Sequence, residues 1–510
     1  MDSILHHVAH RRQIRNAVRC AVGFLALAPI LLLSSPPATN APAVPSSNAV
    51  LLLDRHGGIL PGATNDPAAT PGGPSNGAQR PQIPAPPRGA PQAEAVRQRI
   101  ADSKSGREWF PSTPPVLPAY LANLDEYGNT ALQPGALFNL APVSSAVQSV
   151  KMALSEVGLR YNFYQSVTIA SMSGPTSGAN ALQYYTATYL GKWGVSENPS
   201  WGTAAWLSTE FNAQRGLSSN SRSQSLQGNL GSVVNPNATV FGPQGLWISE
   251  LAWQQSLMNG DLVVLAGQLD QSNYIDSNLY ANNSQGQFLN SAFVNSEVLP
   301  ITYNNLGMNL QYQPGTNGYV MLGIGANAQT AGQSPFTELG FNGVSYLLEL
   351  GWTPGDVLGL GAGVYRLQPF VATVGGVTQA GVGINLQQRL GKQSPFGWFG
   401  RFGVGGTAVT VNGASAEVAT GFLLQAPLQW AGLCPGRVND SLGMGFVWSR
   451  PSNAGNNVSN NNEYGIEGVY VLQLTPLVTL EPDLQVLWNP ATAPNAQRNI
   501  VFQLEFNLTL

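Results

Sequence analysis

The chain is poor in charge and in cysteine, and each shortage removes a class of protein. Asp, Glu, Lys and Arg make up 10% of the 510 residues, whereas an average soluble domain has roughly 25%. The formal net charge of −3 is too small to indicate nucleic acid as a partner. The only cysteines are Cys20 and Cys434, and Cys20 falls in a segment that we expect to be removed. We therefore predict neither a disulfide nor a cysteine-type metal site.

Histidine is missing from most of the chain. All four histidines lie within the first 56 residues, which excludes a Ser-His-Asp triad, a His-ligated zinc ion and a histidine base from the remainder. Glu481 and Asp483 resemble the paired carboxylates of a glycosidase, but two residues apart on a strand they are only neighbours on one face. We predict no enzyme activity, no cofactor and no metal site.

The chain also lacks an apolar run of the roughly 18 residues that a membrane-spanning helix needs. The apolar stretch Ala21–Leu33 has 13 residues, follows four arginines and precedes Thr39-Asn40-Ala41, a plausible cleavage site. This order is typical of a secretory signal peptide. We predict a signal peptide over residues 1–41, with an uncleaved anchor as the alternative.

Residues 42–107 are rich in Pro, Gly and Ala, and no Phe, Tyr or Trp occurs between Phe24 and Trp109. Such a stretch buries too little apolar surface to offset its ordering entropy, so we predict that it is disordered. Its role is either that of a spacer or that of a tether. Residues 108–158 form a mixed segment with a short helix over Ser144–Glu156, on which Ser144 or Ser145 is the expected cap and the apolar stripe is Val147, Val150, Leu154 and Val157.

From Leu159 onward, what the chain has in abundance is alternation of apolar and polar residues. The last eleven residues place Ile500, Phe502 and Leu504 on one face and Val501, Gln503 and Glu505 on the other, as a strand with an oily and a wet side does. An unpaired terminal strand of this kind is an aggregation hazard. Closure of a barrel in a membrane removes that hazard.

The same pattern recurs in Val382–Leu390, Tyr464–Leu474 and Val478–Trp488. In Asp261–Asp270 we expect Val263, Leu265 and Leu269 to face lipid, and Gln268 and Asp270 to face inward. Roughly 22 residues are available for each strand with its connection, if a strand spans ~10 residues. The fold class is therefore all-β, a transmembrane antiparallel β-barrel of about 16 strands over residues 159–510, preceded by the short helix and the disordered stretch.

Four blocks in this region resemble the carbohydrate-selective porins of the OprB type, over roughly residues 144–510. They are Leu251–Leu257 with Gly260–Asp270 and Asn282–Asn290, then Gly397–Gly403, then Pro435–Gly445, and finally Glu467–Pro490 with its Leu480-Glu-Pro-Asp-Leu-Gln485. The resemblance implies an outer-membrane porin of a Gram-negative-type bacterium for passive diffusion of small sugars, often monosaccharides such as glucose. The chain departs from the usual pattern in its last residue, Leu510, where Phe or Trp is common.

Strand phase assigns thirteen polar residues to the inner face as lining of the pore. They supply amide, carboxylate and guanidinium groups, a mixture that suits sugar hydroxyls: Glu250, Gln254, Gln268, Asp270, Arg366, Gln368, Asn385, Arg389, Arg401, Glu467, Glu481, Asp483 and Glu505. The alternative for each charged residue is a structural pair that braces the wall. Trp247, Trp253 and Trp352 either stack on sugars or lie at the lipid interface. From Leu159 onward 17 acidic residues outnumber 11 basic ones, which predicts weak cation selectivity if the acids face the lumen.

The expected partners are small neutral sugars, outer-membrane lipid and the barrel assembly machinery, with no nucleic acid. Monomer and homotrimer both stay open. Two alternatives to a carbohydrate-selective porin are compatible with the sequence. One is a general diffusion porin. The other is a structural envelope protein whose barrel is mainly an anchor and whose working part is residues 42–107.

Overall fold

The computed structural model describes residues 141–156, 158–198, 203–240, 244–315, 317–326, 343–374, 377–391, 394–406, 413–434, 437–452, 458–493, 495–496 and 498–510. The predicted signal peptide (1–41), the Pro/Gly/Ala-rich stretch (42–107) and the part of the mixed segment before Ala141 lie outside the described residues.

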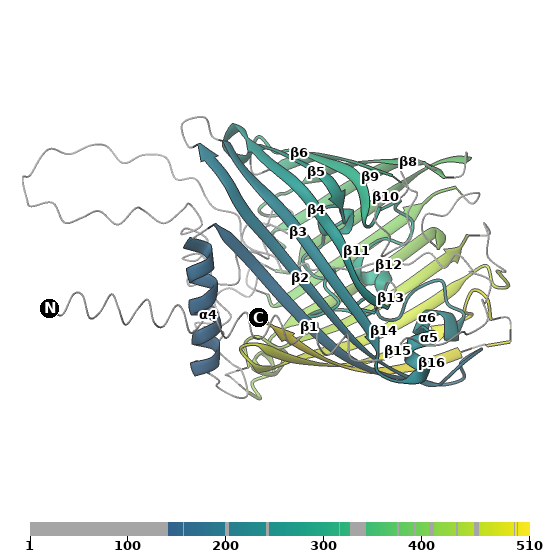
Figure 1. Ribbon diagram of the computed structural model, residues 1–510. Helices are drawn as coiled ribbons and strands as arrows, with labels where there is room; N and C mark the ends of the chain where they lie inside the picture. Colours follow the sequence, from purple (N-terminus) through teal and green to yellow (C-terminus); the bar gives the residue numbers. More distant parts are fainter. Residues whose placement is uncertain are drawn as a thin grey trace, which may run out of the picture.

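Sixteen antiparallel strands close into one barrel in sequence order (Figure 1). This confirms the predicted fold class and strand number. The strands are β1 (Leu159–Met172), β2 (Ala181–Asn198), β3 (Thr203–Gly216), β4 (Gly245–Leu257), β5 (Leu262–Leu269), β6 (Asn305–Tyr312), β7 (Gly318–Ala326), β8 (Val344–Trp352), β9 (Gly363–Val374), β10 (Val377–Arg389), β11 (Phe396–Val404), β12 (Ala414–Gln425), β13 (Ser441–Pro451), β14 (Glu463–Thr475), β15 (Val478–Trp488) and β16 (Arg498–Thr509).

The barrel is closed by the pairing of β1 with β16. Thr168 lies opposite Glu505 in this register, and at the edge Phe163 and Leu510 exchange two backbone hydrogen bonds of 2.9 Å each. The terminal strand therefore has partners on both sides, β1 and β15. No edge is left at this seam, which is the condition that a strand in hydrocarbon must meet.

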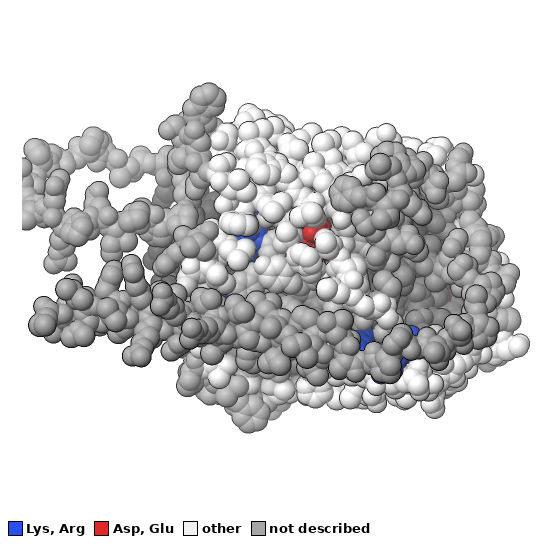
Figure 2. Space-filling model, in the orientation of Figure 1, with Lys and Arg blue, Asp and Glu red and all other residues white. Residues whose placement is uncertain are grey.

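Alternation along the strands separates an apolar outer face from a buried inner one. On β16, Phe502 is 49% exposed and Phe506 39%, whereas Gln503 and Glu505 are fully buried. This confirms the two faces predicted for the terminal strand. Figure 2 shows only isolated charged residues on the described part of one outer face, as a lipid-facing surface requires. No described helix is both long and apolar enough to cross a membrane.

The predicted short helix is present as α4 (Ala141–Glu156) and lies at the barrel end that also holds the C-terminus (Figure 1). It begins before Ser144 and Ser145, so these residues are inside the helix rather than at its cap. Lys151 ties the helix to β1, because its Nζ donates to Asn162 Oδ1 at 3.1 Å and lies 5.5 Å from the centre of the Tyr161 ring. Burial lowers the pKa of Lys151 to about 7.

The apolar outer face predicts that a charged side chain destabilises the barrel most near the middle of a strand. Leu484 lies in the middle of β15 and is 50% exposed. Leu484→Arg should reduce the free energy of unfolding by ~2–4 kcal/mol, whereas Val377→Arg at the first residue of β10 should cost about 0–1 kcal/mol, because the penalty depends on depth in the bilayer. Urea unfolding in lipid vesicles measures both. Equal costs would show that Leu484 does not face the centre of the membrane.

Candidate functional site

Two long connections at the barrel end opposite α4 fold into the interior. We call residues 226–240, between β3 and β4, the short insert, and residues 270–304, between β5 and β6, the long insert. Both are rich in Asn, Ser and Gln and almost entirely buried. Their short helices are α6 (Leu226–Leu230), η4 (Gln271–Asn273) and α7 (Ser291–Val294), which begin at polar caps Ser225, Asp270 and Asn290, as helix starts commonly do. A further short helix, α5 (Ser219–Ser223), precedes the short insert.

The long insert crosses the whole interior and touches walls that are far apart. Asn273 Nδ2 donates to Glu210 Oε2 on β3 at 2.8 Å. The Leu279 backbone N–H donates to Gln387 Oε1 at 2.9 Å on β10, which is seven strands away from β3 around the barrel. The insert is therefore held across the lumen and not only along one side.

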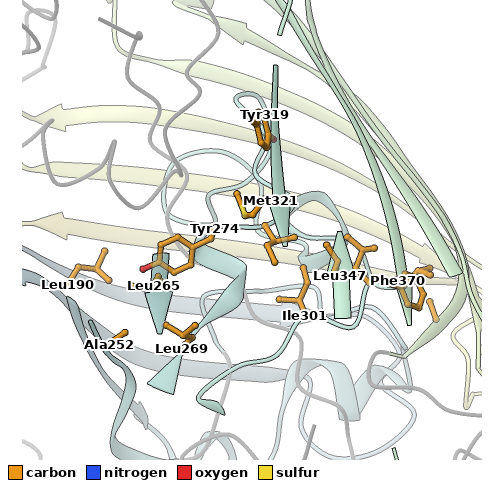
Figure 3. Close-up of a cluster of buried hydrophobic side chains, with 14 residues drawn as sticks. Leu190, Ala252, Leu265, Leu269, Tyr274, Ile301, Tyr319, Met321, Leu347 and Phe370 are labelled. Carbon is orange, nitrogen blue, oxygen red and sulfur yellow. The ribbon is translucent and has the colours of Figure 1, made fainter. Parts of the chain in front are cut away.

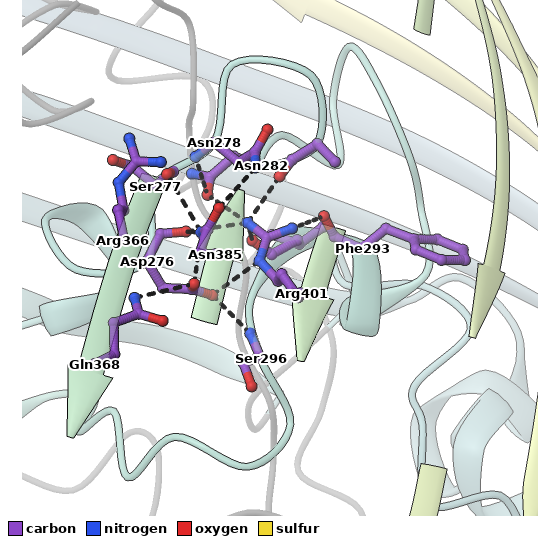
Figure 4. Close-up of polar contacts among 12 residues, drawn as sticks. Asp276, Ser277, Asn278, Asn282, Phe293, Ser296, Arg366, Gln368, Asn385 and Arg401 are labelled. Atoms are coloured by element: carbon purple, nitrogen blue, oxygen red, sulfur yellow. Dashed lines mark hydrogen bonds and ion pairs between the residues drawn. The ribbon is translucent and has the colours of Figure 1, made fainter. Parts of the chain in front are cut away.

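A buried ion pair lies at the centre of this arrangement (Figure 4). Arg401 on β11 and Asp276 on the long insert are both fully buried, with Arg401 Nε 2.9 Å from Asp276 Oδ2. The remaining guanidinium nitrogens donate to the backbone oxygens of Phe293 at 2.7 Å and of Ala281 and Val294 at 2.8 Å. Arg401 thus joins the outgoing arm of the insert, at Asp276 and Ala281, to its returning arm, at Phe293 and Val294. A planar group with five donors is suited to this role.

Neighbouring strands hold the same aspartate. Its backbone N–H donates to Glu349 Oε2 at 2.9 Å, and Glu349 is 3.7 Å from Arg366 Nε. Gln368 Nε2 donates to Asp276 Oδ1 at 3.2 Å and Asn385 Nδ2 donates to the Asp276 backbone oxygen at 2.8 Å. Strands β8 to β11 therefore converge on one residue of the insert.

Inner-wall glutamates accept hydrogen bonds from the inserts around most of the barrel. Glu467 accepts from the backbone N–H groups of Leu289 at 2.7 Å and Asn290 at 3.0 Å, and Glu250 accepts from Tyr274 at 2.7 Å. A loop inside a barrel has backbone donors that no strand pairs, so acceptors must come from the wall. The residues that serve in this way are Glu210, Glu250, Glu349, Glu417, Glu463, Glu467 and Glu505.

Apolar packing fixes the inserts as well. One core joins the long insert to β5, β7, β8 and β9 through residues such as Leu265, Ile301 and Phe370 (Figure 3). A second joins both inserts to β11–β14, and in it Phe288 and Phe293 have ring centres 5.2 Å apart. A Cβ at Gly443 would be 2.8 Å from the Phe288 ring and one at Gly445 2.7 Å from the Phe293 ring. Glycine at these two positions lets the rings pack directly against β13.

Most of the predicted lining residues are on the inner face but buried against other groups. Each is at most 5% exposed: Glu250, Gln254, Arg366, Gln368, Asn385, Arg389, Arg401, Glu467, Glu481, Asp483 and Glu505. Glu467 and Glu505 bind the inserts, whereas Glu481 accepts from Asn507 and Thr479. Asp483 accepts from Gln485 and Gln503. The structure therefore uses Glu467 and Glu505 to bind the inserts, and it engages Glu481 and Asp483 in hydrogen bonds within the wall.

The strand Leu262–Leu269 has the opposite orientation from the one expected. Leu265 and Leu269 face inward and belong to the core under the long insert. Gln268 pairs with the outward-facing Leu251 and donates to the Ile248 backbone oxygen at 2.7 Å. Asp270 follows the strand and caps η4. The assignment failed because it assumed a wet interior, whereas here the inner face packs against a folded loop.

The three tryptophans divide between the two faces. Trp253 and Trp352 face outward, at 46% and 56% exposure, as the lipid-interface interpretation requires. Trp247 faces inward, at 6% exposure, and packs against Tyr303 of the long insert.

Asp276, Glu297, Glu349 and Glu417 are parts of the site that sequence reasoning missed. Glu349 and Glu417 follow the same alternation as the residues that were selected, so strand phase could have found them. Asp276 and Glu297 lie in a loop without periodicity. In the described residues, no group of three or more His, Cys, Asp or Glu side chains is arranged to hold a metal ion.

A closed barrel of sixteen antiparallel strands with a loop folded into its lumen is the architecture of a porin, a diffusion channel of bacterial outer membranes. Among solved structures, the high-pH structure of Pseudomonas putida OprB is similar, with a TM-score of 0.57 and 15% identity over 74% of this chain and 99% of that chain. The low-pH structure of the same protein gives 0.45 at 16% identity, over 74% and 100%. Pseudomonas aeruginosa OccK11 (OpdR) gives 0.41 at 10%, over 69% and 96%. The first match shows a shared fold.

The model of a protein family described as carbohydrate-selective porin, OprB family, matches residues 185–380 and 376–510. No curated sequence matches the chain significantly. The chain belongs to the OprB family of carbohydrate-selective porins, which confirms the resemblance seen in the sequence and places the protein in the outer membrane of a Gram-negative-type bacterium.

The Arg401–Asp276 pair predicts which substitution releases the long insert from its docked position. Arg401→Met keeps most of the side-chain volume but leaves Asp276 buried without its cation, which should destabilise the docked insert by about 3–5 kcal/mol. Single-channel recordings should then show a larger and noisier conductance, and Arg401→Lys should be intermediate because it restores charge but not the fork of donors.

The matched control is Arg450→Met, whose side chain is exposed on β13. It should leave the conductance unchanged. A wild-type conductance in Arg401→Met would show that the pair does not hold the insert.

Proposed function

We propose that small neutral sugars diffuse along the exposed side of the long insert. Inside a closed barrel, an insert side chain that keeps exposed surface faces the lumen or its mouth, which is the path of a solute. On the long insert the half-buried residues are Ser277, Leu279, Asn283, Gln285, Gly286 and Tyr303. This surface offers hydroxyls, amides and apolar patches, which suit the O–H and C–H groups of a sugar.

One observation carries the preference for neutral solutes. Within residues 270–304, all of which the structure describes, the charged residues are Asp270, Asp276 and Glu297, and all three are fully buried. The lumen-facing side of the insert is therefore uncharged. Hydrogen bonds of amide and hydroxyl type are strong enough to select a polyol and weak enough to release it, as passive conduction requires.

The protein acts as a channel and not as an enzyme, on this proposal. The terminal strand β16, with its apolar outer face, is the segment that we expect the barrel assembly machinery to receive, and outer-membrane lipid surrounds the apolar band. General diffusion without a sugar preference is the alternative that the following measurement separates.

Proteoliposomes should swell faster with glucose than with an amino acid of similar size, because the zwitterion has to carry two charges past an uncharged surface. In planar bilayers, sugar should reduce the ion conductance of the open channel. Equal swelling rates for glucose and the amino acid would contradict the sugar preference and leave a general diffusion porin.

The identity of the lining makes a separate prediction. Asn283→Lys adds a charge where the insert faces the lumen, so it should shift the reversal potential in a salt gradient toward anions, most strongly at low salt. Glu481→Gln removes a carboxyl group from a fully buried site and should leave the reversal potential near the wild-type value. A large shift in Glu481→Gln with none in Asn283→Lys would show that the wall acids line the pore, as the sequence first suggested.

A further inference from the structure

Glu297 makes the contact that ties the returning arm of the long insert to β12. Its backbone N–H donates to Glu417 Oε2 at 2.5 Å, and its own Oε1 accepts from Ser291 Oγ at 2.5 Å. Glu297 is fully buried and Glu417 is 1% exposed. Two carboxyl groups, one from the insert and one from the wall, are therefore buried together.

The groups that face this contact are mostly acidic. Glu417 comes from β12, and Glu463 on β14 interacts electrostatically with Glu297. Asp276 and Arg401 both interact electrostatically with Glu417. Arg401 already donates hydrogen bonds to Asp276 and to three further backbone oxygens, so it is not a dedicated partner of Glu417. Glu463 is held separately, by Ser232, Val233 and Val234 of the short insert.

Unused polar atoms mark the same place. Glu297 Oε2 and Glu417 Oε1 have no hydrogen-bond partner within the described structure, and neither has Ser449 Oγ. Ser449 lies opposite both Glu417 and Glu463 in the strand register. Ionisation of either carboxyl would place a negative charge in a buried space among other acidic groups, where the nearest cation, Arg401, is already engaged.

We propose that the contact between Glu297 and Glu417 is pH-sensitive. It holds the long insert against β12 while Glu297 is protonated, and it releases the insert once Glu297 ionises. The proposal goes beyond the transport of sugars, since it concerns the seating of the insert whatever solute passes. Burial, together with the nearby Glu463, raises the pKa of Glu297 from 4.5 to about 8.

The direction of the effect follows from proton linkage. Between pH 4.5 and about 8 the seated insert keeps a proton on Glu297 that the released insert, with its ordinary pKa, has lost. Release is therefore favoured as pH rises through this window, by up to about tenfold per pH unit, and levels off above it. The insert is seated most firmly at acidic pH.

Hydrogen exchange of the full-length protein in lipid vesicles tests the pH-sensitive Glu297–Glu417 contact. After correction for intrinsic exchange rates, amide protection in peptides that cover residues 291–299 should fall between pH 5 and pH 8, by up to about tenfold per pH unit. Glu297→Gln keeps the shape of the side chain without the ionisation and should abolish this slope. Asp356→Asn, in the turn between β8 and β9, should keep it.

Channel recordings give a second readout on the same variants. Wild type should become noisier from pH 6 to pH 9, and Glu297→Gln should remain quiet. A slope or noise identical in wild type and Glu297→Gln would overturn the proposal. A wild-type slope that disappears on adding millimolar Ca²⁺ and returns with chelator would also overturn it, because it would show that the carboxyl pair holds a cation instead of a proton. Heat-modifiable migration in gels confirms that each variant is folded.

Discussion

The interior of this porin depends on one guanidinium. Arg401 donates to Asp276 and to backbone oxygens from both arms of the long insert, so it holds both arms to β11. A buried charge of this kind is tolerated only when each of its donors is used. Here the strands supply the cation and the insert supplies the anion, and neither half is satisfied without the other.

The described polar side chains of the inner wall mainly bind the inserts and form little of the surface that a solute meets. A barrel of sixteen strands leaves a lumen wide enough for water, and filling part of it with loops creates a demand for hydrogen-bond acceptors. Glutamates such as Glu467 meet that demand by accepting backbone N–H groups. Phe288, Phe293 and Phe399 add an aromatic cluster with ring centres 5.2–5.8 Å apart, so this part of the barrel interior has a packed core like that of a soluble domain.

Because the wall acids are buried, the net charge of the barrel does not describe the surface that a solute meets. The excess of acidic residues over basic ones is real, but the acids on β14–β16 are buried at 0–1% exposure. Glu463, Glu467 and Glu505 accept hydrogen bonds from the inserts, whereas Glu481 and Asp483 accept them from neighbouring wall residues. The surface that a solute meets is set instead by residues such as Asn283 and Gln285, which belong to the insert and carry no charge.

What the sequence determined by itself was the barrel. A period of two in side-chain polarity is a local property, and it set the strands, their number and the outer face, down to the exposed Phe502 and buried Gln503 of the last strand. It also placed Arg366, Arg401, Glu467 and Asp483 on the inner face. The resemblance to a porin family was equally readable, and two of its blocks, Gly397–Gly403 and the one ending at Gly445, prove to carry contacts of the inserts.

What only the tertiary structure decided was where the loops go. Residues 270–304 have no periodicity, and nothing local states that Asp276 meets Arg401, 125 positions away. Because the inserts enter the lumen, inward-facing Leu265 and Leu269 become core and inward-facing acids become docking groups. The polarity of an inner face depends on what fills the barrel, and that is a contact between distant parts of the chain.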